Sequence, residues 1–146
     1  MSGSAFAATT SLGTLTTATG IVVSPAAGAT VNMASVAGVG DVNGDGLDDF
    51  IVGAAFSGSS AGFATLVFGK AEGWASIQLP AAPAPATIDF TGTNQTRTGF
   101  TVSGLGDVNG DGLADLLVTA TGVSAPGRSF AGAGYVVFGK TSGWAD

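Results

Sequence analysis

Two short acidic loops carry the side chains best suited to chemistry in this sequence. They read Asp41-Val42-Asn43-Gly44-Asp45-Gly46-Leu47-Asp48-Asp49 and Asp107-Val108-Asn109-Gly110-Asp111-Gly112-Leu113-Ala114-Asp115. In both loops, oxygen-bearing side chains occupy relative positions 1, 3, 5 and 9, and the leucine carbonyl can contribute from position 7. Ca²⁺ takes about six to eight oxygen ligands from carboxylates and carbonyls, so this spacing predicts a calcium site in each loop.

The distribution of charge supports a bound cation. Seven of the ten acidic residues lie in the two loops. Carboxylates packed this closely repel one another and raise one another's pKa unless a cation neutralises them. The alternative is a pair of Asn-Gly and Asp-Gly hairpin turns with solvated acids. The near-identical duplicate with the same spacing favours the metal, at about two Ca²⁺ ions per chain.

The residues after each loop identify the kind of calcium loop. An EF-hand loop ends on an acidic ligand and continues into a helix. Here the corresponding position holds Val52 in the first copy and Val118 in the second. The apolar and β-branched runs Phe50 to Ala54 and Leu116 to Ala120 have the length and composition of strands. Each loop therefore leads into a strand, which argues against the helical calcium motifs.

The composition indicates an all-β chain without an enzyme site. The 146 residues include 25 glycines and only 10% charged residues, a mixture typical of many short strands and tight turns. The sequence has no histidine and no cysteine, the commonest general base and the thiol nucleophile, so we expect no enzymatic activity. The net charge of −6 argues against nucleic acid or an anionic membrane as a partner.

Sequence features also bear on origin and location. No run is apolar enough for insertion across a membrane. The opening Met1-Ser2-Gly3-Ser4 lacks the basic and apolar regions of a signal peptide and resembles an expression-vector scar. We therefore interpret the chain as an excised or engineered fragment. Its acidic, lysine-poor composition together with calcium loops suggests an extracellular or cell-surface origin.

The calcium loops are part of a longer internal repeat. Asp107 follows Asp41 by 66 residues, whereas Phe68-Gly69-Lys70 returns 70 residues later as Phe138-Gly139-Lys140. The four extra residues place a longer surface loop at Val123 to Gly132. Each unit has apolar second and third strands, which predicts burial on both faces of these strands. The expected strands are Ile21 to Ser24, Asn32 to Val39, Phe50 to Ala55, Ala64 to Phe68, Thr87 to Phe90, Gly99 to Leu105, Leu116 to Ala120 and Tyr135 to Phe138.

These features resemble the FG-GAP repeat of integrin-α-type β-propellers. The resemblance rests on Gly40 to Ala54 with Val67 to Lys70, and on Gly99-Phe100, Gly106 to Val118 and Val136 to Lys140. It implies an all-β fold with two four-stranded antiparallel propeller blades. We divide the chain into a scar at 1–4, a first unit with a leading strand at 5–74, and a second unit lacking its last strand at 75–146. The resemblance implies the calcium ligands Asp41, Asn43, Asp45, Leu47 and Asp49, then Asp107, Asn109, Asp111, Leu113 and Asp115.

In that family, ligands are met on the face opposite the calcium loops. The resemblance places three loops on this face, where a protein or a glycan would bind: Phe56 to Gly62, Gly92 to Thr98 and Val123 to Gly132. Arg97 and Arg128 fall in these loops, where they either form an anionic ligand site or are simply solvated. Trp74 and Trp144 follow the third strands, and we expect them to pack between blades rather than to stack on a sugar.

Two blades cannot close a propeller, which typically has about four to eight. We therefore expect copies of the chain to complete a ring by exchanging the N-terminal strand Ile21 to Ser24, which would supply the missing last strand of a neighbour. A trimer would give six blades and a tetramer eight, and we favour the tetramer. The function expected is a calcium-stabilised structural or adhesion scaffold, and the alternative is a lectin-like propeller that binds carbohydrate.

Overall fold

The computed structural model describes residues 12, 15–18, 20–58, 60–80 and 87–144. The expected scar at residues 1–4 and most of the proline-rich segment after Pro80 lie outside this part. Its elements are all strands: β1 Val23–Pro25, β2 Ser35–Gly40, β3 Asp49–Ala54, β4 Phe63–Val67, β5 Ile77–Leu79, β6 Thr87–Thr91, β7 Thr98–Gly106, β8 Asp115–Ala120 and β9 Ala133–Val137. The described residues include no helix that is long and apolar enough to cross a membrane.

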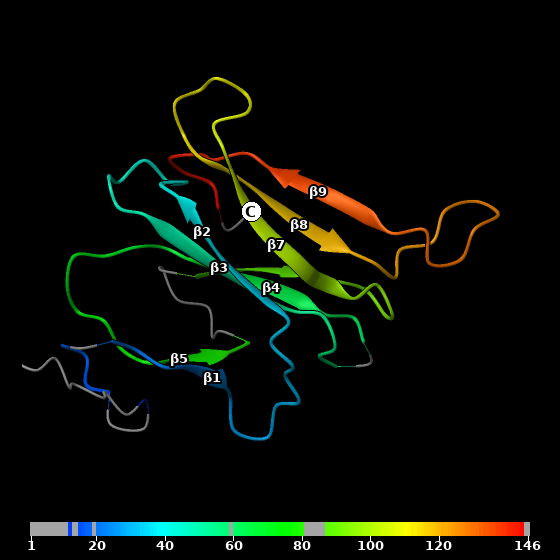
Figure 1. The fold of residues 1–146 in the computed structure, drawn as a ribbon, viewed down its shortest axis with the longest axis horizontal. Coiled ribbons are helices and arrows are strands. Elements are labelled where there is room, and N and C mark those ends of the chain that lie inside the picture. Colours follow the sequence, from blue (N-terminus) through cyan, green and yellow to red (C-terminus); the bar gives the residue numbers. More distant parts are fainter. Residues whose placement is uncertain (1–11, 13–14, 19, 59, 81–86, 145–146) are drawn as a thin grey trace, which may run out of the picture.

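The strands form two main sheets and one small one (Figure 1). The first sheet has the antiparallel order β2-β3-β4-β6 and the second the order β7-β8-β9. These are the four-stranded and the incomplete unit expected from the sequence. The first sheet takes its fourth strand from Thr87–Thr91, so it extends beyond residue 74, where the sequence analysis ended the first unit.

The ends of the sheets define two loop regions on opposite sides of the molecule (Figure 1). The loops 41–48 and 107–114, here called the calcium loops, join β2 to β3 and β7 to β8. The loops 55–62, 92–97 and 121–132, here called the upper loops, lie at the other end of the strands. The longer loop expected in the second unit is 121–132, and it projects furthest from the sheets.

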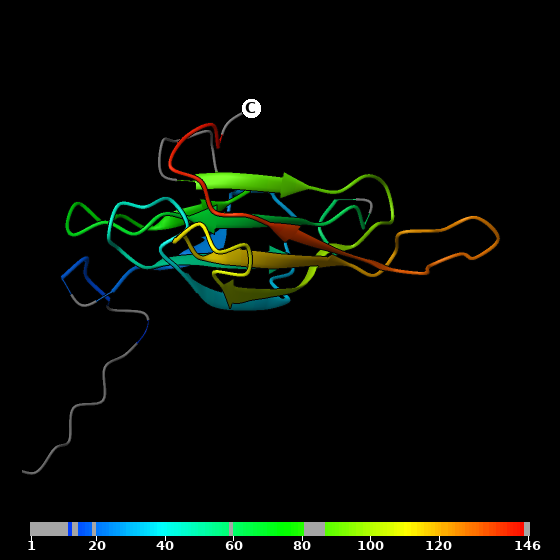
Figure 2. The same ribbon diagram turned by 90° about the horizontal axis from the view of Figure 1, so that it is seen from above.

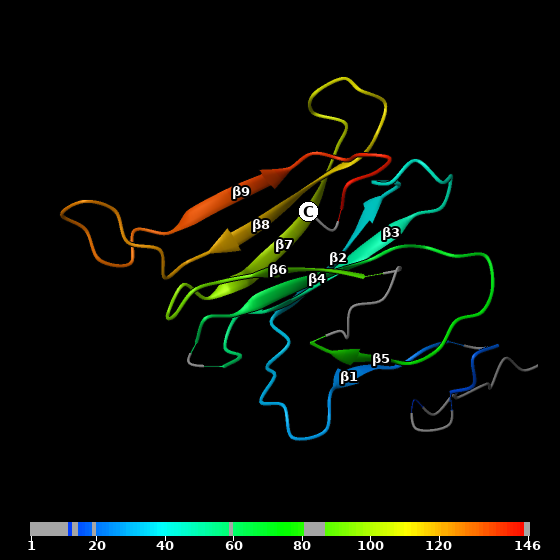
Figure 3. The same cartoon turned by 180° about the vertical axis from the view of Figure 1, so that it is seen from behind.

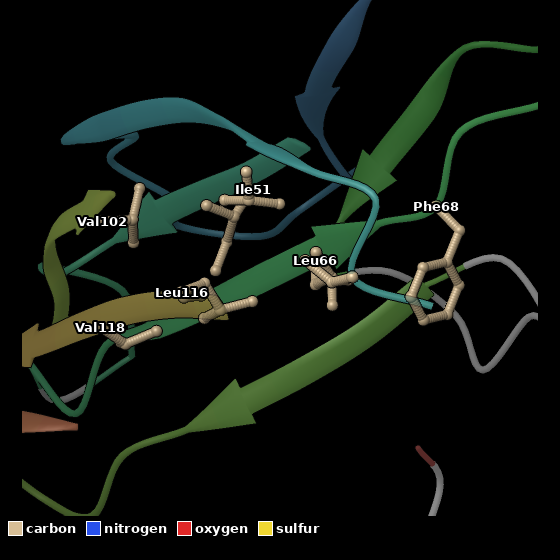
Figure 4. Close-up of a cluster of buried hydrophobic side chains, with 9 residues drawn as sticks. Ile51, Leu66, Phe68, Val102, Leu116 and Val118 are labelled. Atoms are coloured by element: carbon tan, nitrogen blue, oxygen red, sulfur yellow. The ribbon is translucent and has the colours of Figure 1, made fainter. Parts of the chain in front are cut away.

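The two sheets pack face to face with their strands along nearly the same direction (Figure 2). Ile51, Leu66 and Phe68 of the first unit meet Val102, Leu116 and Val118 of the second in the core (Figure 4). Ile51, Leu66 and Leu116 are fully buried there. The prediction of burial on both faces is confirmed for β4, which is buried along its whole length. It is wrong for β9, whose residues are half-buried or exposed because none of the sheets in the described part of the chain covers its far face.

Glycines allow the sheets to approach at backbone distance. A Cβ on Gly53 would lie 2.1 Å from the carbonyl oxygen of Gly99, and one on Gly104 would lie 2.8 Å from the carbonyl oxygen of Gly38. Both distances are shorter than any real Cβ contact, so a side chain here would force the blades apart. The hydroxyl of Ser35 uses the same proximity to donate a hydrogen bond to the Gly99 carbonyl at 3.2 Å.

The N-terminal strand has a partner within the chain. β1 pairs in parallel with β5, a strand that the sequence analysis did not predict (Figure 3). Val23, Ile77 and Leu79 of this pair pack against Val52 and Phe63 on the outer face of the first sheet. The strand expected for exchange with a neighbour is therefore engaged on its own first blade in this single chain.

Asp89 lies on β6, the outer strand of the first sheet, and its side chain tests how this strand packs. It accepts a hydrogen bond from the hydroxyl of the fully buried Thr65. Burial raises the pKa of Asp89, and the bond from Thr65 offsets this in part. A raised pKa in the folded state means that the carboxyl stabilises the fold below its ordinary pKa of 3.8 and loses that contribution as pH rises through the folded value.

We therefore expect Asp89→Asn, which keeps an acceptor for Thr65 without the charge, to raise Tm at about pH 7 and to change it little at about pH 3. Thermal unfolding by circular dichroism at both pH values measures this. Thr65→Val is the companion variant and should lower Tm at about pH 7, because it leaves the buried carboxylate without a donor. An equal Tm change for Asp89→Asn at both pH values would contradict the assignment.

Candidate metal centre

Backbone N–H groups organise the first calcium loop around its own side chains. Asp41 Oδ1 accepts from Gly44 at 2.6 Å and from Asp45 at 3.2 Å, and Asp41 Oδ2 accepts from Gly46 at 2.8 Å. Asn43 Oδ1 accepts from Asp45 at 2.9 Å, and Asp45 Oδ1 accepts from Leu47 at 2.9 Å. These are local side-chain to backbone turns of the kind that Asp and Asn favour. Gly44 and Gly46 both have positive φ, which lets the chain curl within so few residues.

The second calcium loop repeats this geometry bond for bond. Asp107 accepts from Gly110, Asp111 and Gly112 at 2.7, 3.1 and 2.8 Å. Asn109 Oδ1 accepts from Asp111 at 3.0 Å, and Asp111 Oδ1 accepts from Leu113 at 2.9 Å. The loops differ in exposure: Val42 of the first is fully buried beneath the second blade, whereas Val108 of the second is 55% exposed.

The carboxylate at position 9 has a structural role that ligand spacing alone did not reveal. Asp49 is 2% exposed and Asp115 is fully buried. Asp49 accepts from the N–H of Val42 at 2.9 Å and of Gly69 at 2.7 Å. Asp115 accepts from Val108 and Gly139, both at 2.8 Å. Each side chain therefore ties the start of its calcium loop to the segment that leaves the third strand.

The pKa directions reflect these partners. Burial raises the pKa of Asp49 against the lowering effect of the Gly69 and Val42 N–H groups, and the charges of Asp45 and Asp41 add to the increase. The N–H of Gly112, followed by those of neighbouring residues, lowers the pKa of Asp107. The mutual repulsion expected from the sequence thus contributes at Asp49, while the backbone donors dominate at Asp107.

The donor set fits a hard cation, because positions 1, 3, 5, 7 and 9 supply only oxygen atoms in both loops. Oδ1 of Asp41 and of Asp107 accepts two N–H groups, but Oδ2 of each accepts only one and keeps a lone pair for a cation. Within the described ranges, no three acidic side chains gather into a metal-binding cluster. At position 9, Asp49 and Asp115 accept hydrogen bonds from backbone N–H groups.

Each calcium loop also contacts the neighbouring blade. The Ala114 N–H donates to the carbonyl of Asp41 at 3.0 Å, and the Lys140 N–H donates to the carbonyl of Val42 at 2.9 Å. A Cβ on Gly40 would lie 3.0 Å from the Ala114 Cβ. Ala114 therefore lies against the start of the first calcium loop, whereas Asp48 at the same position of the first loop is exposed.

The expectation that both tryptophans pack between blades is met by Trp144 and not by Trp74. Trp144 meets the edge of Phe68 of the first blade, with ring centroids 5.5 Å apart, and its indole N–H donates to the Lys140 carbonyl at 2.6 Å. Trp74 lies 6.4 Å from Phe50 of its own blade. A lysine lies over each ring, Lys140 at 5.3 Å and Lys70 at 5.1 Å. Trp144 is therefore an interblade contact, and Trp74 packs within its own blade.

The arginines lie among the upper loops, but only Arg97 is held in place by aromatic rings. Its guanidinium carbon lies 5.9 Å from the ring centre of Phe56 and 5.6 Å from that of Phe130. Arg128 is exposed at the end of the turn that begins at Ala125. The sequence offered one signal for the Arg97 cluster, namely phenylalanines in loops otherwise built from small residues.

Comparison with known proteins agrees with this geometry. The model of the FG-GAP repeat family matches residues 33–67 and 98–137. These two matches run from just before β2 to the end of β4, and from the start of β7 to the end of β9. No curated protein matches the chain. The repeated loops, the two antiparallel sheets and the family match lead to one conclusion: this chain belongs to the FG-GAP repeat family, and carries two of its repeats.

Proposed function

We propose that this chain is a calcium-stabilised β-propeller module that works as a structural or adhesion scaffold in an extracellular or cell-surface setting. The observation that carries the proposal is the pair of calcium loops with identical hydrogen bonding and an all-oxygen donor set. The first calcium loop is bonded to the second blade through the N–H groups of Ala114 and Lys140, and Leu113 of the second calcium loop packs beside Gly44 of the first. Calcium is therefore proposed to hold loop and blades together, and no catalytic role is proposed.

Calcium binding should stabilise the folded chain measurably. An ion that binds only the native state adds about 2.7 kcal/mol per site at a hundredfold excess over Kd. EDTA should therefore lower Tm, and Ca²⁺ should restore it more fully than Mg²⁺, which requires a smaller octahedral site. Asp45→Ala and Asp111→Ala should each remove one of the two ions counted by isothermal titration calorimetry.

The matched control is Asp48→Ala, because Asp48 is exposed at position 8 and the second loop already carries alanine there. This variant should keep both ions and the full Tm response. A melting curve that is the same in EDTA and in Ca²⁺ would overturn the calcium proposal.

The surface of the second blade supports association between copies of the chain. Three residues of the first blade that the second blade buries have exposed counterparts on the second blade itself. Leu66 is 0% exposed, whereas its equivalent Val136 is 50% exposed. Phe68 is 9% exposed and its equivalent Phe138 is 51% exposed. Val42 is 0% exposed and its equivalent Val108 is 55% exposed. Because the repeats are equivalent, the face that contains Val136 and Phe138 has the shape and chemistry to accept another blade of the same kind.

The occupant we propose is the first blade of a second copy. In the chain, β1 and β5 cover part of the outer face of the first blade, at Val52 and Phe63, which is the face that would dock on Val136 and Phe138 of another copy. Exchange of β1 would uncover that face for docking. The same exchange would supply a fourth strand to the free edge of β9. The rings that result are a trimer of six blades or a tetramer of eight, and we favour the tetramer.

Light scattering should therefore show a single species of three or four chains. Val136→Asp, which places a charge on the docking face, and deletion of residues 1–24 should each yield smaller species. Ala131→Asp adds the same charge to an exposed loop and should leave the assembly unchanged. A monodisperse monomer of the unmodified chain would contradict the ring.

The glycan-binding alternative has one observation in its favour. A cavity of about 420 Å³ lies between the two blades, and its lining includes Phe90, Tyr135 and four threonines, Thr91, Thr93, Thr96 and Thr98. An aromatic surface beside hydroxyl groups suits a sugar ring, and this volume is within the range of ligand sites. If this alternative holds, a glycan array should show binding that Tyr135→Ala abolishes and Trp74→Ala does not; an array without binding would dismiss it.

A further inference from the structure

The upper loops concentrate the backbone strain of the described chain. Non-glycine residues rarely adopt positive φ, and when they do the strain is often retained for function. Among the described residues, all four that do so lie in these three loops: Ser60, Gln95, Arg97 and Phe130, at 58°, 64°, 54° and 54°. The loops are also packed tightly, since a Cβ on Gly122 would lie 1.7 Å from the Gln95 carbonyl oxygen. Two of the loops that hold strained residues therefore approach each other at backbone distance.

Unsatisfied polar groups gather in the same place. A buried polar atom without a hydrogen bond is rare in folded proteins and calls for an explanation. In the part of the chain that the structure describes, every such side-chain atom belongs to the upper loops: Ser57 Oγ, Arg97 Nε and Thr121 Oγ1. Strain and unmet hydrogen bonding therefore coincide on one surface.

Arg97 lies at the centre of this surface. Its N–H donates to the Ser60 carbonyl at 3.0 Å, which joins two of the upper loops. Phe56 and Phe130, from the other two loops, lie within 6 Å of its guanidinium and restrict its side chain. Phe130 comes from the longer loop of the second unit, and Phe56 in turn meets the edge of Phe100 at 6.2 Å. The guanidinium is thus positioned before any ligand arrives, and the cation has lost part of its hydration.

The charge of Arg97 is not balanced nearby. The upper loops contain Arg97 and Arg128 and no acidic residue. The described residues provide no hydrogen-bond partner for Arg97 Nε. Nε is itself buried, but Arg97 as a whole is only half-buried, and its guanidinium carries further N–H donors on the two Nη atoms. These donors can bind a planar carboxylate through paired N–H bonds.

We propose that Arg97, held between Phe56 and Phe130, is a binding site for an aspartate or glutamate carboxylate of a protein partner. Arginine is enriched at the energetic centres of protein interfaces, and phenylalanine is enriched in interfaces relative to the rest of the surface. Phe56, Phe100 and Phe130 are 42%, 42% and 54% exposed around the cation. The choice of a protein ligand rests on the adhesion role proposed above. The carboxylate site itself rests on the geometry of Arg97 and does not depend on calcium.

The test is an NMR titration of the isotope-labelled chain in Ca²⁺-saturated buffer. The probe is an N-acetylated, C-amidated Gly-Asp-Gly peptide, and the matched probe is Gly-Asn-Gly with the same blocked ends. We expect a saturable shift of the Arg97 Nε–H signal with the aspartate peptide and at least a tenfold weaker response with the asparagine peptide. Arg97→Gln and Phe130→Ala should each weaken aspartate binding at least tenfold, whereas Arg128→Gln should change it less than threefold.

Several outcomes would overturn this proposal while the proposed calcium role stands. Equal responses to both peptides, or binding unaffected by both Arg97→Gln and Phe130→Ala, would show that Arg97 does not select a carboxylate. Tenfold tighter binding of glucuronate than of the aspartate peptide would reassign the site to acidic sugars. Because the fold of each variant is read from the same spectra, a misfolded Arg97→Gln is recognised, and exposed Phe130→Ala then decides the matter. Failure of the calcium role would instead appear in the melting curves without any peptide.

Discussion

A buried carboxylate with two backbone partners is the constraint on which each blade depends. Asp49 receives N–H groups from the start of its calcium loop and from the end of the third strand, and Asp115 does the same in the second repeat. Two charge-assisted bonds offset much of the cost of removing such a group from water. One side chain thereby fixes the loop against the sheet. The neighbouring blade then packs on that fixed loop, because the Ala114 and Lys140 N–H groups bond to it.

This arrangement connects the first calcium loop to the interface between the blades. Val42 lies inside the first calcium loop and also belongs to the core shared by the two sheets. A shift of the loop backbone should therefore displace Phe68 and Leu116 in that core, because packed interiors transmit small displacements. The second loop has the same internal bonds but no blade over Val108. The two calcium loops thus have the same internal hydrogen bonds, but only the first is packed beneath a neighbouring blade.

The sequence was sufficient for features that repeat and for strands with strong periodic signals. The strands of both sheets were placed within a few residues, because apolar runs and glycine turns mark them locally. β5 escaped notice because three residues with one glutamine carry little signal, and its parallel partner β1 lies more than 50 residues away. The buried role of Asp49 could not be derived from spacing, since the bond to Gly69 exists only after β4 has folded back. Arg97 was interpretable only once Phe56 and Phe130 were brought together from separate loops.

The separation of acidic residues and arginines gives the molecule an electric dipole. Seven of ten acids lie in the calcium loops, while both arginines lie at the opposite end. A chain of net charge −6 is repelled as a whole by an acidic surface, yet its dipole turns the arginine end toward that surface during the encounter. Loading two Ca²⁺ ions would change the net charge from −6 to −2, which weakens the repulsion and the dipole together. Encounter rates with an acidic partner would then depend on calcium and on ionic strength, even with no ion near the contact.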